Sequence, residues 1–151
     1  MPEMQNPARL YPFLLASEVA GAVAILWHGV PIYRSLLEKT FIDPVDGTVV
    51  GWAISGIVLI QAPYWLSTFK VFPLLKVARH IFAGHALAFL ARLNFVFVSG
   101  LFASLVYARG PDIEFVAWRA IMLAAVLFSM FCFSLELERL AKLFLEADHR
   151  R

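Results

Sequence analysis

The segment HIFAGHALAFLARLNFVFVSGLFASLVY spans residues 80–107 and contains one formally charged side chain, that of Arg92. A helix needs roughly 20 mostly apolar residues to cross the ~30 Å hydrocarbon layer of a membrane, and this segment exceeds that length. Three further apolar segments also reach it, at 10–33, 49–69 and 115–135. We therefore predict an all-α integral membrane protein with four transmembrane helices.

The composition of the chain agrees with this prediction. Hydrophobic residues make up 61% of it and charged residues 16%, with a mean hydropathy of +0.75. Soluble domains are roughly 45–50% apolar and about 25% charged. Four spans leave no room for a separate soluble domain, so we expect residues 1–151 to form one membrane domain in a lipid bilayer. Nucleic acid is not an expected partner, because no basic stripe lies on a solvent-facing element.

The connections between the apolar segments are short and contain turn residues, such as Asp43-Pro44 and Gly110-Pro111. Short connections make sequential helices antiparallel, which predicts an up-down-up-down bundle. Lysine and arginine are twice as frequent on the side that would hold both termini as on the other side. The positive-inside rule then predicts that both termini are cytoplasmic, in a bacterial inner (plasma) membrane.

Residues 136–151 differ in character from the apolar segment before them. Charged residues such as Glu136 and Lys142 alternate there with leucines such as Leu137 and Leu140. This pattern predicts an amphipathic, cytoplasmic extension of the fourth helix. The extension could lie on the membrane surface or bind a partner helix, and the sequence leaves both interpretations open.

Glu18 and Arg92 are the charged residues that a bilayer makes expensive. A bare ion near the centre of a transmembrane helix costs roughly 2.5–3.5 kcal/mol on insertion scales. Counted at ~1.5 Å per residue from the cytoplasmic side, Glu18 lies about 12 Å deep and Arg92 about 18 Å deep. Because an arginine side chain can extend toward its interface, the two could form an ion pair that fixes the register of helices one and three. The alternative is a substrate or proton site.

Two further polar residues fall in the same half of the predicted bundle. Gln61 lies on the second helix, and His85 shares a helix face with Arg92 at the i,i+7 spacing. Together with Glu18 they form a predicted intramembrane polar layer, toward which the fourth helix brings Ser129, Cys132 and Glu136. The alternative is that such groups hydrogen-bond between helices, each contributing about 0.6 kcal/mol. We favour the alternative for Gln61 and leave His85 open.

Histidine positions decide which cofactors the sequence supports. His28 lies near one end of its helix and His80 and His85 near the opposite side, so a haem with two histidine ligands is not expected. Residues 24–28, Ala-Ile-Leu-Trp-His, resemble the Ala-x-x-x-His pattern of light-harvesting polypeptides. That resemblance implies His28 as a ligand of a bacteriochlorophyll-type pigment, although those polypeptides have one span. Otherwise no cofactor is predicted, and no metal site, because His80 and His85 are five residues apart rather than four.

Small residues recur every four positions on the first helix, at Ala16, Ala20 and Ala24, and Gly84 and Ala88 repeat this spacing on the third. In lipid, such residues let helices approach closely. They predict either packing within the chain or association, as a homo-oligomer or with other membrane subunits.

Function is the least determined property. The chain contains no local catalytic motif, which favours a protein that is not an enzyme; we expect a non-catalytic subunit or assembly factor of a larger membrane complex. One alternative is an oligomeric small transporter or channel that uses Glu18, Arg92 and His85. A second is an intramembrane enzyme that acts on a lipid-like substrate.

Overall fold

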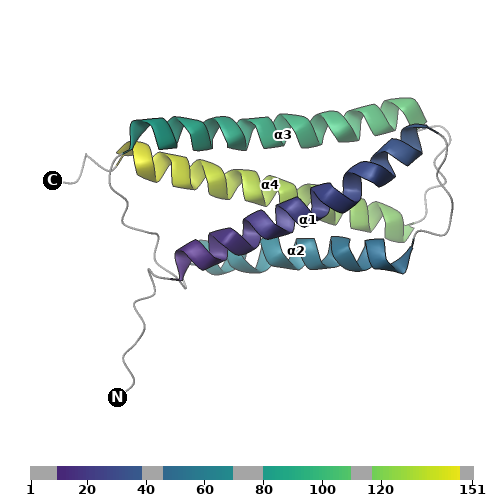
Figure 1. The fold of residues 1–151 in the computed structure, drawn as a ribbon, viewed down its shortest axis with the longest axis horizontal. Coiled ribbons are helices and arrows are strands. Elements are labelled where there is room, and N and C mark those ends of the chain that lie inside the picture. The colour runs from purple at the N-terminus through teal and green to yellow at the C-terminus, as the bar shows by residue number, and fades with distance from the viewer. Residues whose placement is uncertain (1–9, 39–45, 70–79, 110–116, 147–151) are drawn as a thin grey trace, which may run out of the picture.

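The computed structural model describes residues 10–38, 46–69, 80–109 and 117–146. These residues form four α-helices, α1 (Tyr11–Leu37), α2 (Gly47–Thr68), α3 (Ile81–Arg109) and α4 (Ala117–Glu146) (Figure 1). Each helix is long and apolar enough to cross a membrane. The prediction of an all-helical chain with four candidate membrane spans is therefore confirmed, and these spans indicate a membrane protein.

The start of α2 follows from its capping residue. The side chain of Asp46 accepts a hydrogen bond from the backbone N–H of Thr48 at 3.2 Å, and also one from the Thr48 hydroxyl. This satisfies one of the N–H groups that the first turn of a helix leaves without a partner. The same hydrogen bonds lower the pKa of Asp46, because they favour its charged form.

The helices have two common ends, which we name after residues of α1. The Tyr11 end contains the start of α1 and α3 and the end of α2 and α4; the Leu37 end contains their opposite termini. Helix α1 crosses the bundle diagonally (Figure 1). At the Tyr11 end it bonds to α4 through Tyr11 and Glu136, and at the Leu37 end it bonds to α3 through Tyr33 and Ser104. Helix α1 therefore changes neighbours along its length.

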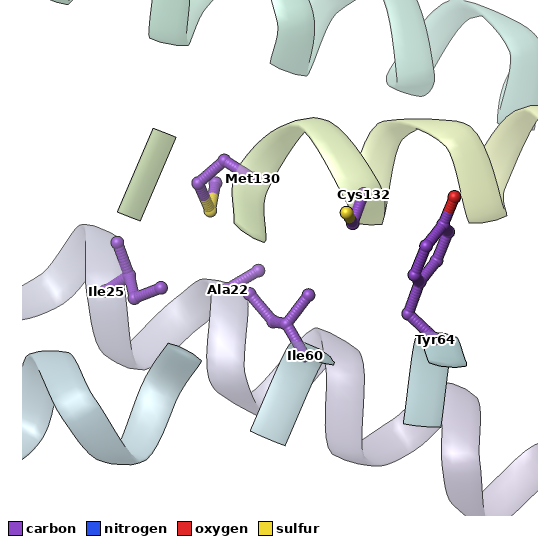
Figure 2. Packing of buried hydrophobic residues seen from close by; sticks show 6 residues of the cluster. All are labelled: Ala22, Ile25, Ile60, Tyr64, Met130 and Cys132. Atoms are coloured by element: carbon purple, nitrogen blue, oxygen red, sulfur yellow. The ribbon is translucent and has the colours of Figure 1, made fainter. Parts of the chain in front are cut away.

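The apolar core lies between α1, α2 and α4. It consists of Ala22 and Ile25 from α1, Ile60 and Tyr64 from α2, and Met130 and Cys132 from α4 (Figure 2). Of its described residues, helix α3 contributes to this core only the partly buried Val98, which packs against it. It packs mainly on α4, where the side-chain amide of Asn94 donates hydrogen bonds to Met130 O at 3.1 Å and Ser134 Oγ at 2.8 Å. The rest of the α3 surface is left largely exposed.

Glycines set the closest helix contacts. A Cβ atom on Gly21 of α1 would lie 2.8 Å from the carbonyl oxygen of Gly56 on α2, and a Cβ on Gly84 of α3 would lie 2.7 Å from Leu145 Cγ on α4. The prediction of close packing at Gly84 is confirmed. Ala16 and Ala20 are exposed instead, so intrachain packing is the wrong interpretation for them. The packed face of α1 is offset from them and contains Gly21, Ala22 and Ile25.

The predicted extension after residue 135 is helical as far as Glu146, but it is not a separate surface element. Four of its residues, Glu136, Leu137, Leu140 and Ala141, are buried inside the bundle. The backbone N–H of His80 also donates to Phe144 O at 3.3 Å. Part of its apolar side therefore packs on the same chain, while contact of its remaining surface with the membrane surface or with a partner helix stays a prediction. Residues 147–151 lie outside the described part.

Candidate functional site

Polar side chains from three helices meet at the Tyr11 end around one carboxylate, that of Glu136 on α4. Its side chain is 2% exposed. Its Oε1 accepts a hydrogen bond from the Tyr11 hydroxyl of α1 at 2.9 Å, and its Oε2 lies 3.4 Å from the Ser67 hydroxyl of α2. One turn further along α4, Arg139 Nη1 donates to the same Oε2 at 3.3 Å. The Glu136 carboxylate is therefore both hydrogen-bonded and charge-compensated.

Arg139 links this carboxylate to α2. Its Nη1 also donates to the Thr68 hydroxyl at 2.9 Å, and its guanidinium carbon lies 5.2 Å from the centroid of the Tyr64 ring. A guanidinium at this distance is attracted by the negative face of the ring. The Arg139 side chain remains 39% exposed, so the cluster reaches the surface on this side.

Glu18 of α1 belongs to the same cluster but is held differently. Its side chain is 2% exposed, and its Oε2 atom is buried with no hydrogen-bond partner within the described residues. The charged groups that act on Glu18 are Glu136 and Arg139 of α4. Burial of a carboxyl oxygen without a partner carries a large free-energy cost. Intramembrane ionisable groups of this kind are functional-site candidates.

Gln61 of α2 forms the predicted interhelical hydrogen bonds. Its Nε2 donates to Ser129 Oγ of α4 at 3.1 Å and lies 3.7 Å from Cys132 Sγ, and its Oε1 accepts from Trp65 Nε1 at 2.8 Å. The amide thus has partners for both its donor and its acceptor atoms. These contacts support the structural interpretation of Gln61, as a link between α2 and α4.

His85 and Arg92 do not lie with Glu18 and Gln61. Both are on the exposed face of α3, whereas Glu18 points into the space between α1, α2 and α4. Within the described residues, no ion pair joins Glu18 and Arg92; the cation near Glu18 is Arg139. The physical reason is the diagonal course of α1, whose Tyr11 end faces α2 and α4 rather than α3. The depth of Glu18 alone could therefore not identify the cation closest to it. The predicted polar layer is therefore divided: Glu18 and Gln61 lie inside the bundle, and His85 and Arg92 lie on its surface.

His28 lies toward the Leu37 end, beside an apolar cavity of about 250 Å³. The cavity is also lined by Tyr33 of α1, Val98 of α3 and Met130 of α4. The His28 ring stacks on Trp52 of α2, with centroids 4.8 Å apart and an interplanar angle of 11°. These contacts neither require nor exclude a pigment, so ligation of one by His28 stays a prediction.

Sequence reasoning included Glu18 in the predicted polar layer and brought Glu136 toward that layer, but it missed Tyr11 and Arg139. One signal was available. Glu136 follows Cys132 by four residues and Ser129 by seven, so the buried face of α4 continues past residue 135 without a break. Arg139, three residues after Glu136, then falls one turn away. No comparable sequence signal identifies Ser67 and Thr68.

Comparison with known proteins does not assign the chain to a family. A scan against protein-family models, a search of curated proteins and a search of solved structures each found no match. In the described part of the chain, no group of three or more His, Cys, Asp or Glu side chains is arranged to hold a metal ion.

Proposed function

We propose that the chain is a non-catalytic subunit or assembly factor of a larger membrane complex, and that it binds its partner through the face of α3 that contains Arg92. The observation that carries the proposal is the exposed position of this arginine within an apolar helix. Its neighbours on the same face, His85, Phe89 and Val96, are exposed as well. This set of four residues is called the Arg92 face below.

The depth of Arg92 makes contact with lipid alone costly. It lies three residues from the middle of α3. Because α3 is longer than a ~30 Å hydrocarbon layer, depth is counted here from the edge of a layer centred on the helix rather than from residue 80, and Arg92 is then about 10 Å from the nearer interface. A charge near the centre of a transmembrane helix costs roughly 2.5–3.5 kcal/mol. A carboxylate on a neighbouring membrane protein, at the same depth, would remove most of this cost.

A second copy of this chain is a poor source for that carboxylate. Glu18 and Glu136 are buried inside the bundle. Of the other carboxylates in the described residues, Glu38 is paired with Arg34 at 2.7 Å and Glu138 with Lys142 at 3.1 Å. Asp46 and Glu146 lie at helix ends, away from the depth of Arg92. Charge complementarity therefore favours a different protein, with a transmembrane helix that carries an aspartate or glutamate.

We also propose, from the lysine and arginine distribution, that the Tyr11 end faces the cytoplasm of a bacterium whose inner membrane holds the protein. The Arg92 face would then lie in the cytoplasmic half of the bilayer. The transporter alternative loses support, because it requires His85 and Arg92 in one internal layer with Glu18.

Native mass spectrometry of the protein in its own membrane tests the proposed complex. The wild type should give a mass that is not a multiple of 17.0 kDa, and R92E should lose the additional component. Arg34→Glu is the matched control, because Arg34 is exposed at the Leu37 end and pairs only locally with Glu38; this variant should retain the component. Replacing the partner's carboxylate with arginine should then restore binding to R92E.

A photo-crosslinking residue at Val96, on the Arg92 face, should capture the same component, whereas one at the exposed Val58 of α2 should not. Masses of only 17.0 kDa or its multiples would reject the proposal and leave lipid or a second copy in contact with Arg92. So would a complex that R92E leaves intact.

A further inference from the structure

The Glu18 carboxyl group stands apart from the proposed partner face and has no structural role that its contacts explain. It is nearly completely buried, and Oε2 has no hydrogen-bond partner in the described part of the chain. Glu136, equally buried, has three. One carboxylate of the cluster is thus held in a complete set of contacts, while the other is left with an unoccupied acceptor atom.

The charges in the cluster do not balance. The groups coupled electrostatically to Glu18 are Tyr11 on α1, and Cys132, Glu136 and Arg139 on α4. On α2 the cluster is completed by the uncharged side chains of Tyr64, Ser67 and Thr68. On α3 the titratable or charged side chains at this level, His85 and Arg92, lie on the exposed face. Two carboxylates therefore share one guanidinium, and with both ionised the buried cluster has a net charge of −1.

We infer that Glu18 is a proton-binding site, whose carboxyl group takes up one proton and releases it again, with Glu136 as its acidic neighbour and Arg139 as the counter-ion that competes with the proton. On uptake, a hydronium ion transfers its proton to Oε2, an O–H bond forms there, and water is released. The net charge of the cluster changes from −1 to zero. We expect the proton to enter at the Tyr11 end, where the Arg139 side chain is 39% exposed.

A proton fits this position better than a metal ion does. The Oε2 atom is enclosed, and a proton requires no additional space. The nearby guanidinium repels a second cation, and the described residues offer no set of three metal-ligating side chains. Hard cations such as Ca²⁺ also need six or more oxygen ligands, which the contacts of this cluster do not supply.

Infrared spectroscopy of the full-length protein in lipid nanodiscs tests the inference. The wild type should show the carbonyl stretch of a protonated carboxyl group, and this band should disappear as the pH is raised. Glu18→Gln should lack the band while retaining the fold, since glutamine has the shape and charge of protonated glutamate. Glu138→Gln is the matched control, because Glu138 is half-exposed and paired with Lys142; this variant should keep the band.

A band that persists in Glu18→Gln would place the proton elsewhere and overturn the inference. Absence of any such band in the wild type, with thermal stability that rises on addition of Na⁺, would identify a cation site instead and overturn it as well. If Glu18→Gln does not fold, carboxyl-labelled glutamate in the wild type gives the answer by NMR. One glutamate that is protonated while all the others are ionised supports the inference, and complete ionisation until the protein unfolds rejects it.

Discussion

At the residue scale, the hydrogen bond between Tyr11 and Glu136 joins the first helix to the last. The tyrosine hydroxyl and the carboxylate are separated by 125 positions in the sequence and by 2.9 Å in space. Both side chains are almost completely buried. Neither group can exchange its partner for water without opening the Tyr11 end of the bundle.

Replacement of Tyr11 with phenylalanine removes this hydrogen bond and changes little else. We expect Tyr11→Phe to lower the free energy of unfolding by about 1.5–3 kcal/mol, because the lost bond is made to a charged acceptor that stays buried. Unfolding with sodium dodecyl sulfate in mixed micelles measures the change. Tyr107→Phe, at a residue that is 91% exposed, is the control and should be neutral. Equal stability of the two variants would contradict the assigned role of Tyr11.

The residue scale also shows where sequence reasoning stops. The cost of inserting a charge into a membrane identified Glu18 and Arg92 as candidate functional residues, and both remain candidates in the structure. The pairing between them was inferred from depth. Whether two side chains meet depends on their depth, on the rotation of each helix about its axis and on the diagonal course of α1, and the sequence indicated only the depth. The rotation and the diagonal course depend on packing at Gly21 and Gly56, which no single-residue cost predicts.

At the scale of elements, the bundle consists of two hairpins, α1 with α2 and α3 with α4, each with a glycine at its closest contact. In lipid, where apolar side chains gain little by moving from lipid to protein, such close backbone approach is a main source of helix association. The contact of Gly21 with Gly56 leaves no room for a side chain on either helix.

Gly56→Ala should therefore destabilise the first hairpin. A Cβ there would lie 2.6 Å from Ile25 Cγ1 and 3.0 Å from Gly21 O, and overpacking of this kind costs about 1–3 kcal/mol. Gly51→Ala on the same helix has open space around its Cβ and should be neutral or stabilising by up to about 1 kcal/mol, from helix propensity. The same unfolding assay compares Gly56→Ala with Gly51→Ala. If Gly56→Ala were the more stable variant, α1 and α2 would be able to move apart without loss of stability.

The elements themselves could be predicted from hydropathy, because four apolar runs of sufficient length leave few alternatives. Hydropathy alone did not predict that the end of α4 is buried, although the helical extension itself was predicted. A change from apolar to charged residues at 136 normally marks the membrane boundary. Here the charge of Glu136 is compensated by Arg139 and by hydroxyl groups from α1 and α2, so the buried face continues. Arg139 is only three residues away, but the hydroxyl groups of Tyr11 and Ser67 are distant from Glu136 in the sequence.

At the scale of the whole molecule, the start of α1 and the end of α4 lie at the same end of the bundle. The chain therefore enters and leaves its helical part on one side. This follows from an even number of antiparallel helices and does not depend on which side of the membrane that end faces.

The orientation can be measured with reporter proteins. We expect green fluorescent protein fused after Arg151 to fluoresce, and alkaline phosphatase fused there to be inactive, because the excess of lysine and arginine favours a cytoplasmic location for the Tyr11 end in the proposed orientation. A phosphatase fusion after Arg109, which follows three helices, is the matched control and should be active. The reverse pattern would invert the proposed orientation and place the Arg92 face in the outer half of the bilayer.

The division into two hairpins affects the order in which the contacts of the protein can form during synthesis. Each glycine contact lies within one hairpin, whereas the hydrogen bonds of Tyr11 with Glu136 and of Gln61 with Ser129 connect the first hairpin to the second. Synthesis proceeds from residue 1, so the first hairpin is complete while the ribosome has yet to make α4. During that interval Glu18, Gln61 and Tyr11 are without the neighbours that surround them in the finished protein. The polar side chains of the first hairpin therefore stay without their α4 partners until α4 has been synthesised and inserted.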